Sequence, residues 1–175
     1  NSQTVNDLQT RSSFKFDGTD DVVSVTHSDH LDVGGNVSIS AWIKLSELPS
    51  VSGYGYAIVS KFYEYEFLIH HNNDSLAMGI PNVAGSSQDT TSLEIGQWYH
   101  LLGTYDGSTI NYYVDGVFSS SVSFSSVPQH NQNNSFTIGA NASNGEDFQG
   151  EISKVRVYNR ALTATEVKNE YSGQA

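Results

Sequence analysis

The segment that most constrains the fold is an alternating run interrupted by two Asp-Gly pairs. It reads WYHLLGTYDGSTINYYVDGVFSS, and the pairs occupy residues 106–107 and 115–116. Asp-Gly suits tight hairpin turns because both residues tolerate positive φ. The run therefore predicts a three-stranded antiparallel meander from about Trp98 to Ser123, and a chain built around such a meander folds as an antiparallel sheet.

Further segments have the same period of two. In NVSISAWIK (36–44), Val, Ile and Ala fall on one face and Ser and Lys on the other. Trp42 is the residue out of keeping on the polar face, so we expect that face to be covered in part. More strands are expected at 56–62, 66–70, 75–80, 119–126, 135–140 and 148–158. One short helix is expected near the C-terminus, where Thr163 and Glu166 have capping-box spacing.

Length and charge restrict the class of protein. The 175 residues suit one domain, which we place at 13–172 behind a linker or N-terminal arm at 1–12. The absence of Cys excludes a disulfide framework, a thiol nucleophile and a zinc–thiolate site. A net charge of −11 argues against nucleic acid as a partner. No apolar run approaches the roughly 20 residues that span a bilayer, so no membrane insertion is expected.

Five motifs in order resemble one family. They are FKFDGTDDVVSV at 14–25, NVSISAWIK at 36–44, GQWYHLLGTYDGSTINYYVDGV at 96–117, SFTIGAN at 135–141 and FQGEISKVRVYNRALTATEV at 148–167. Together they resemble the concanavalin A-like lectin/glucanase superfamily, in particular its laminin G-like and pentraxin-like jelly rolls. The resemblance implies an all-β fold, a two-sheet antiparallel β-sandwich (jelly roll) with one short C-terminal helix.

Catalysis is not expected from the residues present. Glycan-cleaving members of the family that this chain resembles carry three acids in the pattern E-x-D-x-x-E on one strand. No such triple occurs in this sequence. The nearest arrangement is Glu64-Tyr65-Glu66, whose two carboxylates would share a strand face. The G-x-S-x-G signature of serine hydrolases is missing, and we interpret His100 as a structural residue.

Calcium is the cofactor that the acidic residues suggest, as one or two ions. The sequence FDGTDD brings Asp17, Asp20 and Asp21 within five residues. In relatives the first strand and the last long strand lie close together, so the resemblance implies Glu151 as a further ligand. The alternative is an ordinary polar turn at the start of a strand.

A second group of oxygen ligands follows the strand at 135–140. It comprises Asn141, Asn144, Glu146 and Asp147. In pentraxin-like proteins this loop carries calcium ligands together with acidic groups just before another strand, and the resemblance implies Glu64 in that role. The alternative is a solvated loop rich in turn-forming residues.

Sugar recognition is the third expectation, because tyrosine offers both an apolar ring and a polar tip. The candidate ligand-binding residues lie near turns and are Tyr54, Tyr63, Tyr65, His71 and Asn72. The alternative is that most of these tyrosines pack within the sheets.

The leading functional hypothesis is a non-catalytic, lectin-like carbohydrate-binding module of an extracellular or cell-surface protein, with calcium at its site. Its partners would be a glycan or polysaccharide and other domains of a larger chain. Two alternatives stay open, a protein-binding adhesion module of the laminin G type and an atypical glycan-cleaving enzyme.

Overall fold

The computed structural model describes residues 12–33, 35–62, 64–80, 92–123, 133–141 and 145–173. The strands are β1 (Phe14–Asp17), β2 (Val23–Val25), β3 (Val37–Leu45), β4 (Tyr56–Lys61), β5 (Tyr65–His70), β6 (Ser75–Gly79), β7 (Trp98–Tyr105), β8 (Thr109–Val114), β9 (Val117–Ser123), β10 (Phe136–Ile138) and β11 (Gln149–Tyr158). The helices are the short η1 (Asp29–Leu31) and α1 (Pro49–Ser52) and the C-terminal α2 (Ala164–Tyr171).

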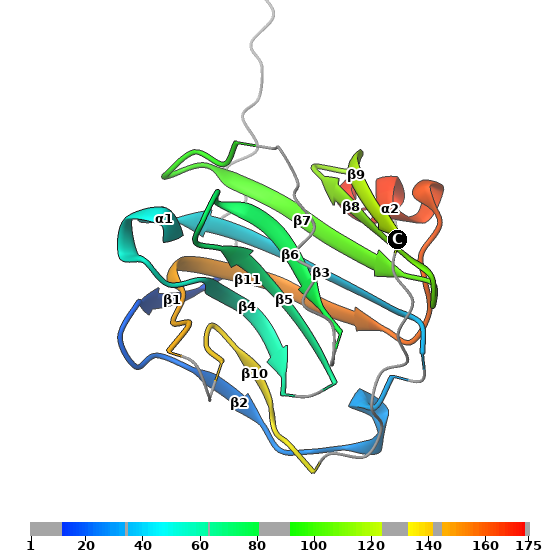
Figure 1. Ribbon diagram of the computed structural model, residues 1–175, viewed down its shortest axis with the longest axis horizontal. Coiled ribbons are helices and arrows are strands. Elements are labelled where there is room, and N and C mark those ends of the chain that lie inside the picture. Colours follow the sequence, from blue (N-terminus) through cyan, green and yellow to red (C-terminus); the bar gives the residue numbers. More distant parts are fainter. Residues whose placement is uncertain are drawn as a thin grey trace, which may run out of the picture.

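Two antiparallel sheets face each other and form a sandwich (Figure 1). The six-stranded sheet has the order β1-β11-β3-β7-β8-β9, and the five-stranded sheet has the order β2-β10-β4-β5-β6. The all-β sandwich with one C-terminal helix is therefore confirmed. The predicted meander is also confirmed, because β7, β8 and β9 pair in sequence order.

The core lies between the sheets and is built from alternate positions of each strand. Ile39 and Ile43 of β3 face Phe67 and Ile69 of β5, and all four side chains are fully buried. Since successive strand residues point to opposite faces, the intervening residues form the two outer faces of the sandwich. Those outer faces carry the polar and charged groups described below.

The connection at 18–22 carries the chain from one sheet to the other. β1 pairs with β11 in the six-stranded sheet, and β2 pairs with β10 in the five-stranded sheet. Gly18 has φ +81°, which allows the sharp turn. Asp17 and Asp21 hold this turn, since the amide of Asp17 donates to Oδ2 of Asp21 at 3.0 Å.

The two Asp-Gly pairs form different turns. Asp115 and Gly116 both have positive φ, 50° and 75°, as the tight hairpin requires. The Asp106-Gly107 pair instead lies in a wider turn between β7 and β8. In this turn, Oδ1 of Asp106 accepts hydrogen bonds from the amides of Ser108 and Thr109 at 2.9 and 2.8 Å. These hydrogen bonds hold the pKa of Asp106 below its ordinary value.

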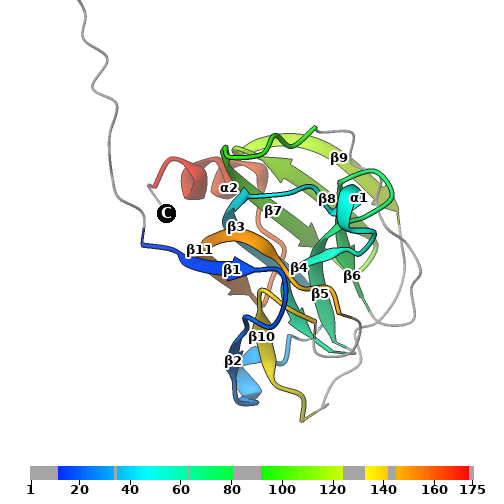
Figure 2. The ribbon, with the colours of Figure 1, turned by 90° about the vertical axis from the view of Figure 1, so that its left-hand side faces the viewer.

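Helix α2 covers part of the outer face of the six-stranded sheet (Figure 2). The capping box is present: the side chain of Thr163 accepts from the amide of Glu166, and Glu166 accepts from the amide of Thr163. Tyr171 stacks on Trp42 with the ring centroids 5.6 Å apart. The expectation that the Trp42 face is covered is therefore confirmed.

A buried polar cluster lies beneath α2. Glu170 accepts a hydrogen bond from Ser40 and another from Arg156, and Nε2 of His100 lies 3.7 Å from the same carboxylate. Although burial alone would raise it, these neighbours hold the pKa of Glu170 below its ordinary value. His100 is 1% exposed and its ring contacts those of Trp42 and Tyr171, which agrees with a structural role.

Candidate functional site

A cluster of carboxylate and amide groups lies on the outer face of the five-stranded sheet. Ser60 of β4 and Glu66 of β5 are register partners, so their side chains share that face. Asn141 follows β10, and its Nδ2 donates to Oε1 of Glu66 at 2.8 Å and to Oε2 of Glu146 at 3.3 Å. We call Ser60, Glu66, Asn141 and Glu146 the Glu66–Glu146 cluster.

Two backbone hydrogen bonds fix the segment that carries Glu146. The amide of Ala57 in β4 donates to the Glu146 carbonyl at 3.0 Å, and the amide of Phe148 donates to the Gly139 carbonyl at 2.8 Å. Phe148 is fully buried in the core. The position of Glu146 is thus set by the sheet and the core rather than by the loop alone.

Two glycines make room for the carboxylates. Gly79 is the register partner of Glu66, and a Cβ at this position would lie 3.4 Å from the Glu66 Cβ. At Gly55 a Cβ would lie 3.3 Å from Oε1 of Glu146 and 3.2 Å from the carbonyl oxygen of Ile69. Larger side chains at these positions would press on the two acids that face each other.

Neither carboxylate of the cluster forms an ion pair with a Lys, Arg or His in the described part of the chain. Burial raises the pKa of Glu66 above its ordinary value, and the charge of Glu146 raises it further. Hydrogen bonds from Ser60 and Asn141 act in the opposite direction. The site therefore holds negative charge at a free-energy cost that a cation or several hydroxyl donors would relieve.

Exposed aromatic and polar groups lie beside this cluster. Tyr54 is 62% exposed and precedes Gly55 directly. At the end of β5, the rings of His70 and His71 stack with their centroids 4.6 Å apart. Asn72 is exposed in the following turn, and its amide donates to Nδ1 of His70 at 3.2 Å. Tyr54 thus precedes β4, and His71 and Asn72 follow β5.

Glu64 is not part of this cluster, and the expectation that it joins the 141–147 loop is wrong. Glu64 lies in the turn before β5, where its amide donates to the Lys61 carbonyl at 2.8 Å. Its buried carboxylate accepts a hydrogen bond from the Lys61 ammonium. Strand alternation starts only at Tyr65, so Glu64 and Glu66 do not share a strand face, and Glu66 is the residue beside Asn141.

Tyr65 is a core residue, which corrects its assignment to ligand binding. Its side chain is fully buried, and its hydroxyl donates to the Leu31 carbonyl at 3.0 Å. Burial raises its pKa well above the ordinary value. Two other candidates, Tyr63 and Asn144, lie outside the described residues.

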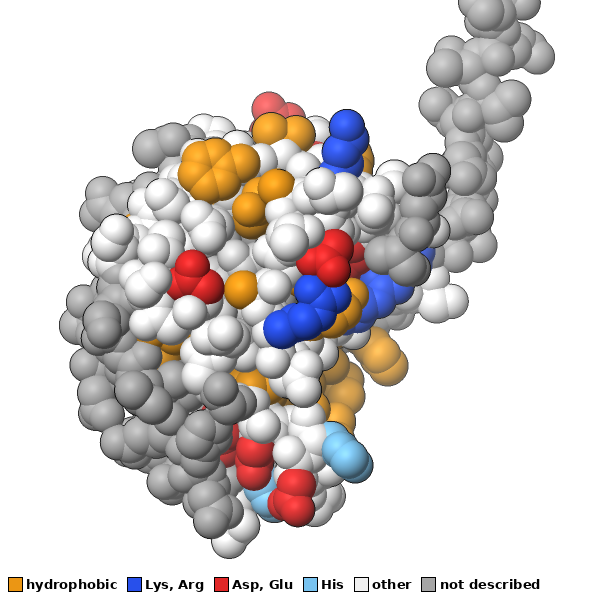
Figure 3. All heavy atoms as spheres, turned by 90° about the vertical axis from the view of Figure 1, so that its right-hand side faces the viewer, with side chains coloured by type: hydrophobic (Ala, Val, Ile, Leu, Met, Phe, Trp, Pro, Cys, Tyr) orange, Lys and Arg blue, Asp and Glu red, His pale blue; other side chains and the backbone are white. Residues whose placement is uncertain are grey.

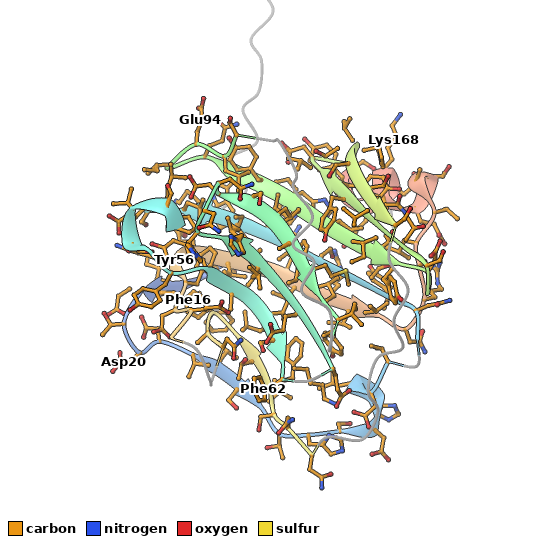
Figure 4. All side chains as sticks on the ribbon, in the orientation of Figure 1. Phe16, Asp20, Tyr56, Phe62, Glu94 and Lys168 are labelled. Atoms are coloured by element: carbon orange, nitrogen blue, oxygen red, sulfur yellow. The ribbon has the colours of Figure 1, made fainter. Side chains whose placement is uncertain are left out.

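The acids of the first turn are arranged differently from the expectation. Glu151 is paired with Lys44 at 2.5 Å and accepts from Ser13 at 2.6 Å, and both contacts hold its pKa below the ordinary value. Asp17 and Asp20 instead interact electrostatically with Asp147. Burial raises the pKa of Asp147 above its ordinary value, and the charges of Asp20 and Asp17 raise it further. Asp20 itself lies at the outer edge of the β1–β2 connection (Figure 4).

Ser60 and Glu66 are the members of the cluster that sequence reasoning missed. In the sequence, Glu66 stands out only as the neighbour of Glu64 in the Glu64-Tyr65-Glu66 arrangement. The available signal was its position in EFLIH, where a charged residue alternates with the apolar Phe67 and Ile69. That pattern places Glu66 on an outer face but does not say which other segment meets it there.

The fold and this cluster define a lectin-like β-sandwich with an acidic, amide-bearing site on one outer sheet face. A family model described as the concanavalin A-like lectin/glucanases superfamily matches residues 17–168. The chain belongs to this family. A search of curated proteins finds no match.

Solved structures with the same fold include a heptameric SAP-like pentraxin from Limulus polyphemus, with a TM-score of 0.70, 17% identity, and coverage of 90% of this chain and 80% of the other. Domain 4 of an extracellular arabinanase from Geobacillus stearothermophilus, solved in complex with arabinotriose, has a TM-score of 0.69 and 21% identity. The match covers 90% of this chain and 75% of that domain. A putative carbohydrate-binding protein from Bacteroides ovatus has a TM-score of 0.69 and 18% identity, and the match covers 89% of this chain and 47% of that protein. The TM-scores show the shared fold, and at these low identities the likeness shows the fold alone. Among the described residues, no helix is both long and apolar enough to cross a membrane.

Proposed function

We propose that this chain is a non-catalytic carbohydrate-binding module of an extracellular protein, with its glycan site at the Glu66–Glu146 cluster. The observation that carries the proposal is the pair of carboxylates that share the amide of Asn141 on an outer sheet face. Acceptor oxygens in such an arrangement accept hydrogen bonds from sugar hydroxyls. Tyr54 supplies an exposed ring for the apolar face of a sugar.

Calcium belongs to this proposal because the donor set fits it. Ca²⁺ prefers carboxylate and carbonyl oxygens, and Glu66, Glu146 and the side-chain oxygen of Asn141 are of that kind. The raised pKa of Glu66 records an unfavourable negative charge that the ion would offset. When bound, the ion would supply coordination positions for sugar hydroxyls, while the protein residues hold and orient it.

Binding rather than cleavage is proposed for this site. The neighbours with the same fold include domains solved in complex with sugars, among them the arabinanase domain with arabinotriose and a botulinum neurotoxin ligand-binding domain with N-acetylneuraminic acid. Both carboxylates of the cluster lie around one amide that donates to each of them. This arrangement suits two acceptors that hold a ligand or an ion in place.

The test is a glycan array followed by calorimetry with the best-bound glycan, in calcium and in EGTA. The double variant Glu66→Gln/Glu146→Gln is expected to lose glycan binding at least tenfold, and EGTA is expected to have the same effect on the native chain. Glu151→Gln is the matched control, because that carboxylate is already paired with Lys44 on the other sheet. An array without any bound glycan, or unchanged affinity in the double variant, would contradict the proposal.

A further inference from the structure

A histidine and two aspartates come together in the β2–β3 connection, which contributes no residue to the Glu66–Glu146 cluster. His27, Asp29 and Asp32 can each offer one ligand atom such that all three atoms lie within 4.8 Å of one another. Nε2 of His27 is 3.5 Å from Oδ1 of Asp29, and its Nδ1 is 3.8 Å from Oδ1 of Asp32. Figure 3 shows histidine and carboxylate side chains gathered at the lower end of the molecule.

The backbone of this segment is held in place by the sandwich. The 3₁₀ turn η1 is closed by the hydrogen bond from the Leu31 amide to the Ser28 carbonyl at 2.8 Å. The hydroxyl of the buried Tyr65 donates to the Leu31 carbonyl at 3.0 Å. Asp32 accepts a hydrogen bond from the Lys61 ammonium, which is itself fully buried. The ligand atoms are therefore mounted on a segment that the core positions.

Charge and an unpaired oxygen atom at this place favour a cation. Asp29, Asp32 and Glu64 contribute three negative charges and Lys61 one positive charge, so the group carries −2 with His27 neutral. Oε2 of Glu64 is buried and lacks a hydrogen-bond partner, so the protein does not fully compensate this negative charge. Buried polar atoms are normally paired, and a divalent ion would neutralise the group. Asp29 is 99% exposed, which leaves the ion a route from solvent.

The ligand types select the kind of ion. Imidazole nitrogen suits Zn²⁺ and its first-row neighbours, whereas Ca²⁺ prefers oxygen alone. Ligand atoms in a tetrahedral zinc site at about 2.1 Å from the metal lie roughly 3.4 Å apart. The 3.5 Å separation between His27 Nε2 and Asp29 Oδ1 is close to that value. Carboxylates and one histidine therefore fit zinc at this end of the molecule better than they fit calcium.

We propose that His27, Asp29 and Asp32 form a Zn²⁺-class metal site within the β2–β3 connection, at the point where Lys61 joins this connection to the end of β4. Lys61 and Glu64 lie behind the site and orient Asp32. The site is separate from the proposed glycan site, because it shares no residue with the Glu66–Glu146 cluster. Zinc binding would raise the melting temperature by mass action, since the unfolded chain does not hold the three ligands together.

The experiment titrates ZnCl2 into the chelator-stripped full chain by calorimetry, with the melting temperature as a second readout. The native chain is expected to bind one ion, and His27→Ala and Asp29→Asn are each expected to weaken that binding at least tenfold. His30→Ala is the matched control, a histidine of the same segment that is exposed and outside the group. Both variants change partly or fully exposed side chains, so the fold is expected to be retained, and circular dichroism checks this.

Two results would overturn the proposal. In one, zinc binds His27→Ala and the native chain with equal affinity. In the other, a His70→Ala/His71→Ala variant loses the ion, which would assign binding to the stacked histidines at the end of β5. Retained zinc affinity in Glu66→Gln/Glu146→Gln is expected, and it separates this site from the fate of the glycan proposal.

Discussion

Each outer face of the sandwich carries a carboxylate that is at least partly removed from water, and the two are stabilised differently. Glu170 on the six-stranded side meets the Arg156 guanidinium, the Ser40 hydroxyl and the His100 ring, and its pKa is lowered. Glu66 on the five-stranded side meets a hydroxyl and an amide but also a second carboxylate, and its pKa is raised. The first acid is compensated by the protein itself.

This difference separates an acid that stabilises the fold from the acid that we propose binds a ligand. Glu170 lies on α2, and the packing of this helix on the six-stranded sheet brings its carboxylate to Ser40, His100 and Arg156. Glu66 keeps a charge that the protein leaves only partly compensated, which is characteristic of groups that act on a ligand. Four substitutions test whether the two faces can be separated in this way.

The largest expected effect is on the covered face. Trp42→Ala removes a ring that is 9% exposed and stacked on Tyr171, and it should destabilise the chain by about 3–5 kcal/mol. Chemical denaturation measures the loss. Trp98→Ala is the control, since this half-buried ring at the start of β7, beside Lys44 with the ammonium 5.3 Å from the ring centroid, is not stacked on Tyr171 and its loss should destabilise the chain clearly less. Glycan affinity that falls together with stability would break the distinction between the faces.

A smaller loss is expected when the compensated acid is neutralised. Glu170→Gln keeps the shape but weakens charge-assisted hydrogen bonds, for a loss of about 1.5–3 kcal/mol at neutral pH. Because folding lowers its pKa, Glu170 contributes stability above its ordinary value of 4.5, and this is lost as the pH falls through the folded value. The free energy of unfolding, measured by chemical denaturation at several pH values, should fall more between neutral and acid pH for the native chain than for the variant. An equal fall in both proteins would contradict the assignment.

The opposite sign is expected on the other face. Folding raises the pKa of Glu66, so its favourable contribution is present below the ordinary value of 4.5 and is lost as the pH rises through the folded value. Metal-free Glu66→Gln should therefore be more stable than the native chain at neutral pH, by about 0.5 kcal/mol, while it loses glycan binding. Thermal denaturation in EGTA at several pH values measures the first effect, and a destabilised variant would be the contrary result.

The smallest stability effect is expected at the rim. Tyr54→Ala removes a ring that is 62% exposed, and its stability should change by no more than about 0.5 kcal/mol. Glycan affinity should fall about tenfold, which corresponds to about 1.4 kcal/mol. Calorimetry and thermal denaturation of the same sample make the comparison. Unchanged affinity would remove Tyr54 from the site and leave the cluster alone to explain binding.

Most of the fold could be predicted because its signals are local. The alternation in β3 and β7, the Asp-Gly hairpin at 115–116 and the capping box at Thr163 are each set within a few residues. The short helices α1 and η1 were not foreseen, because three or four residues carry too little periodicity. The turn at Asp106 is wider than the tight hairpin expected from the Asp-Gly pair, because the Asp106 side chain accepts hydrogen bonds from the amides of Ser108 and Thr109.

The candidate site was only partly predictable. Asn141 and Glu146 could be chosen because they stand in a loop whose composition offers oxygen ligands. The family resemblance points to Glu64 rather than Glu66, because a match along the sequence does not show which of two acids separated by one residue meets the 141–147 loop. The start of β5 at Tyr65 decides between the two acids, and it depends on the hydrogen bond that closes the turn at Lys61.

By itself, the sequence determined the strands, the turn at Asp115, the helix cap and the family, because these depend on neighbours along the chain. Only the tertiary structure decided which charges meet. Glu66 and Asn141 are 75 residues apart in sequence, and Ser40 and Glu170 are 130 apart. Such pairs are set by the strand order of the two sheets and by the packing of α2. The compensation of one acid and the availability of the other are therefore properties of the folded sandwich.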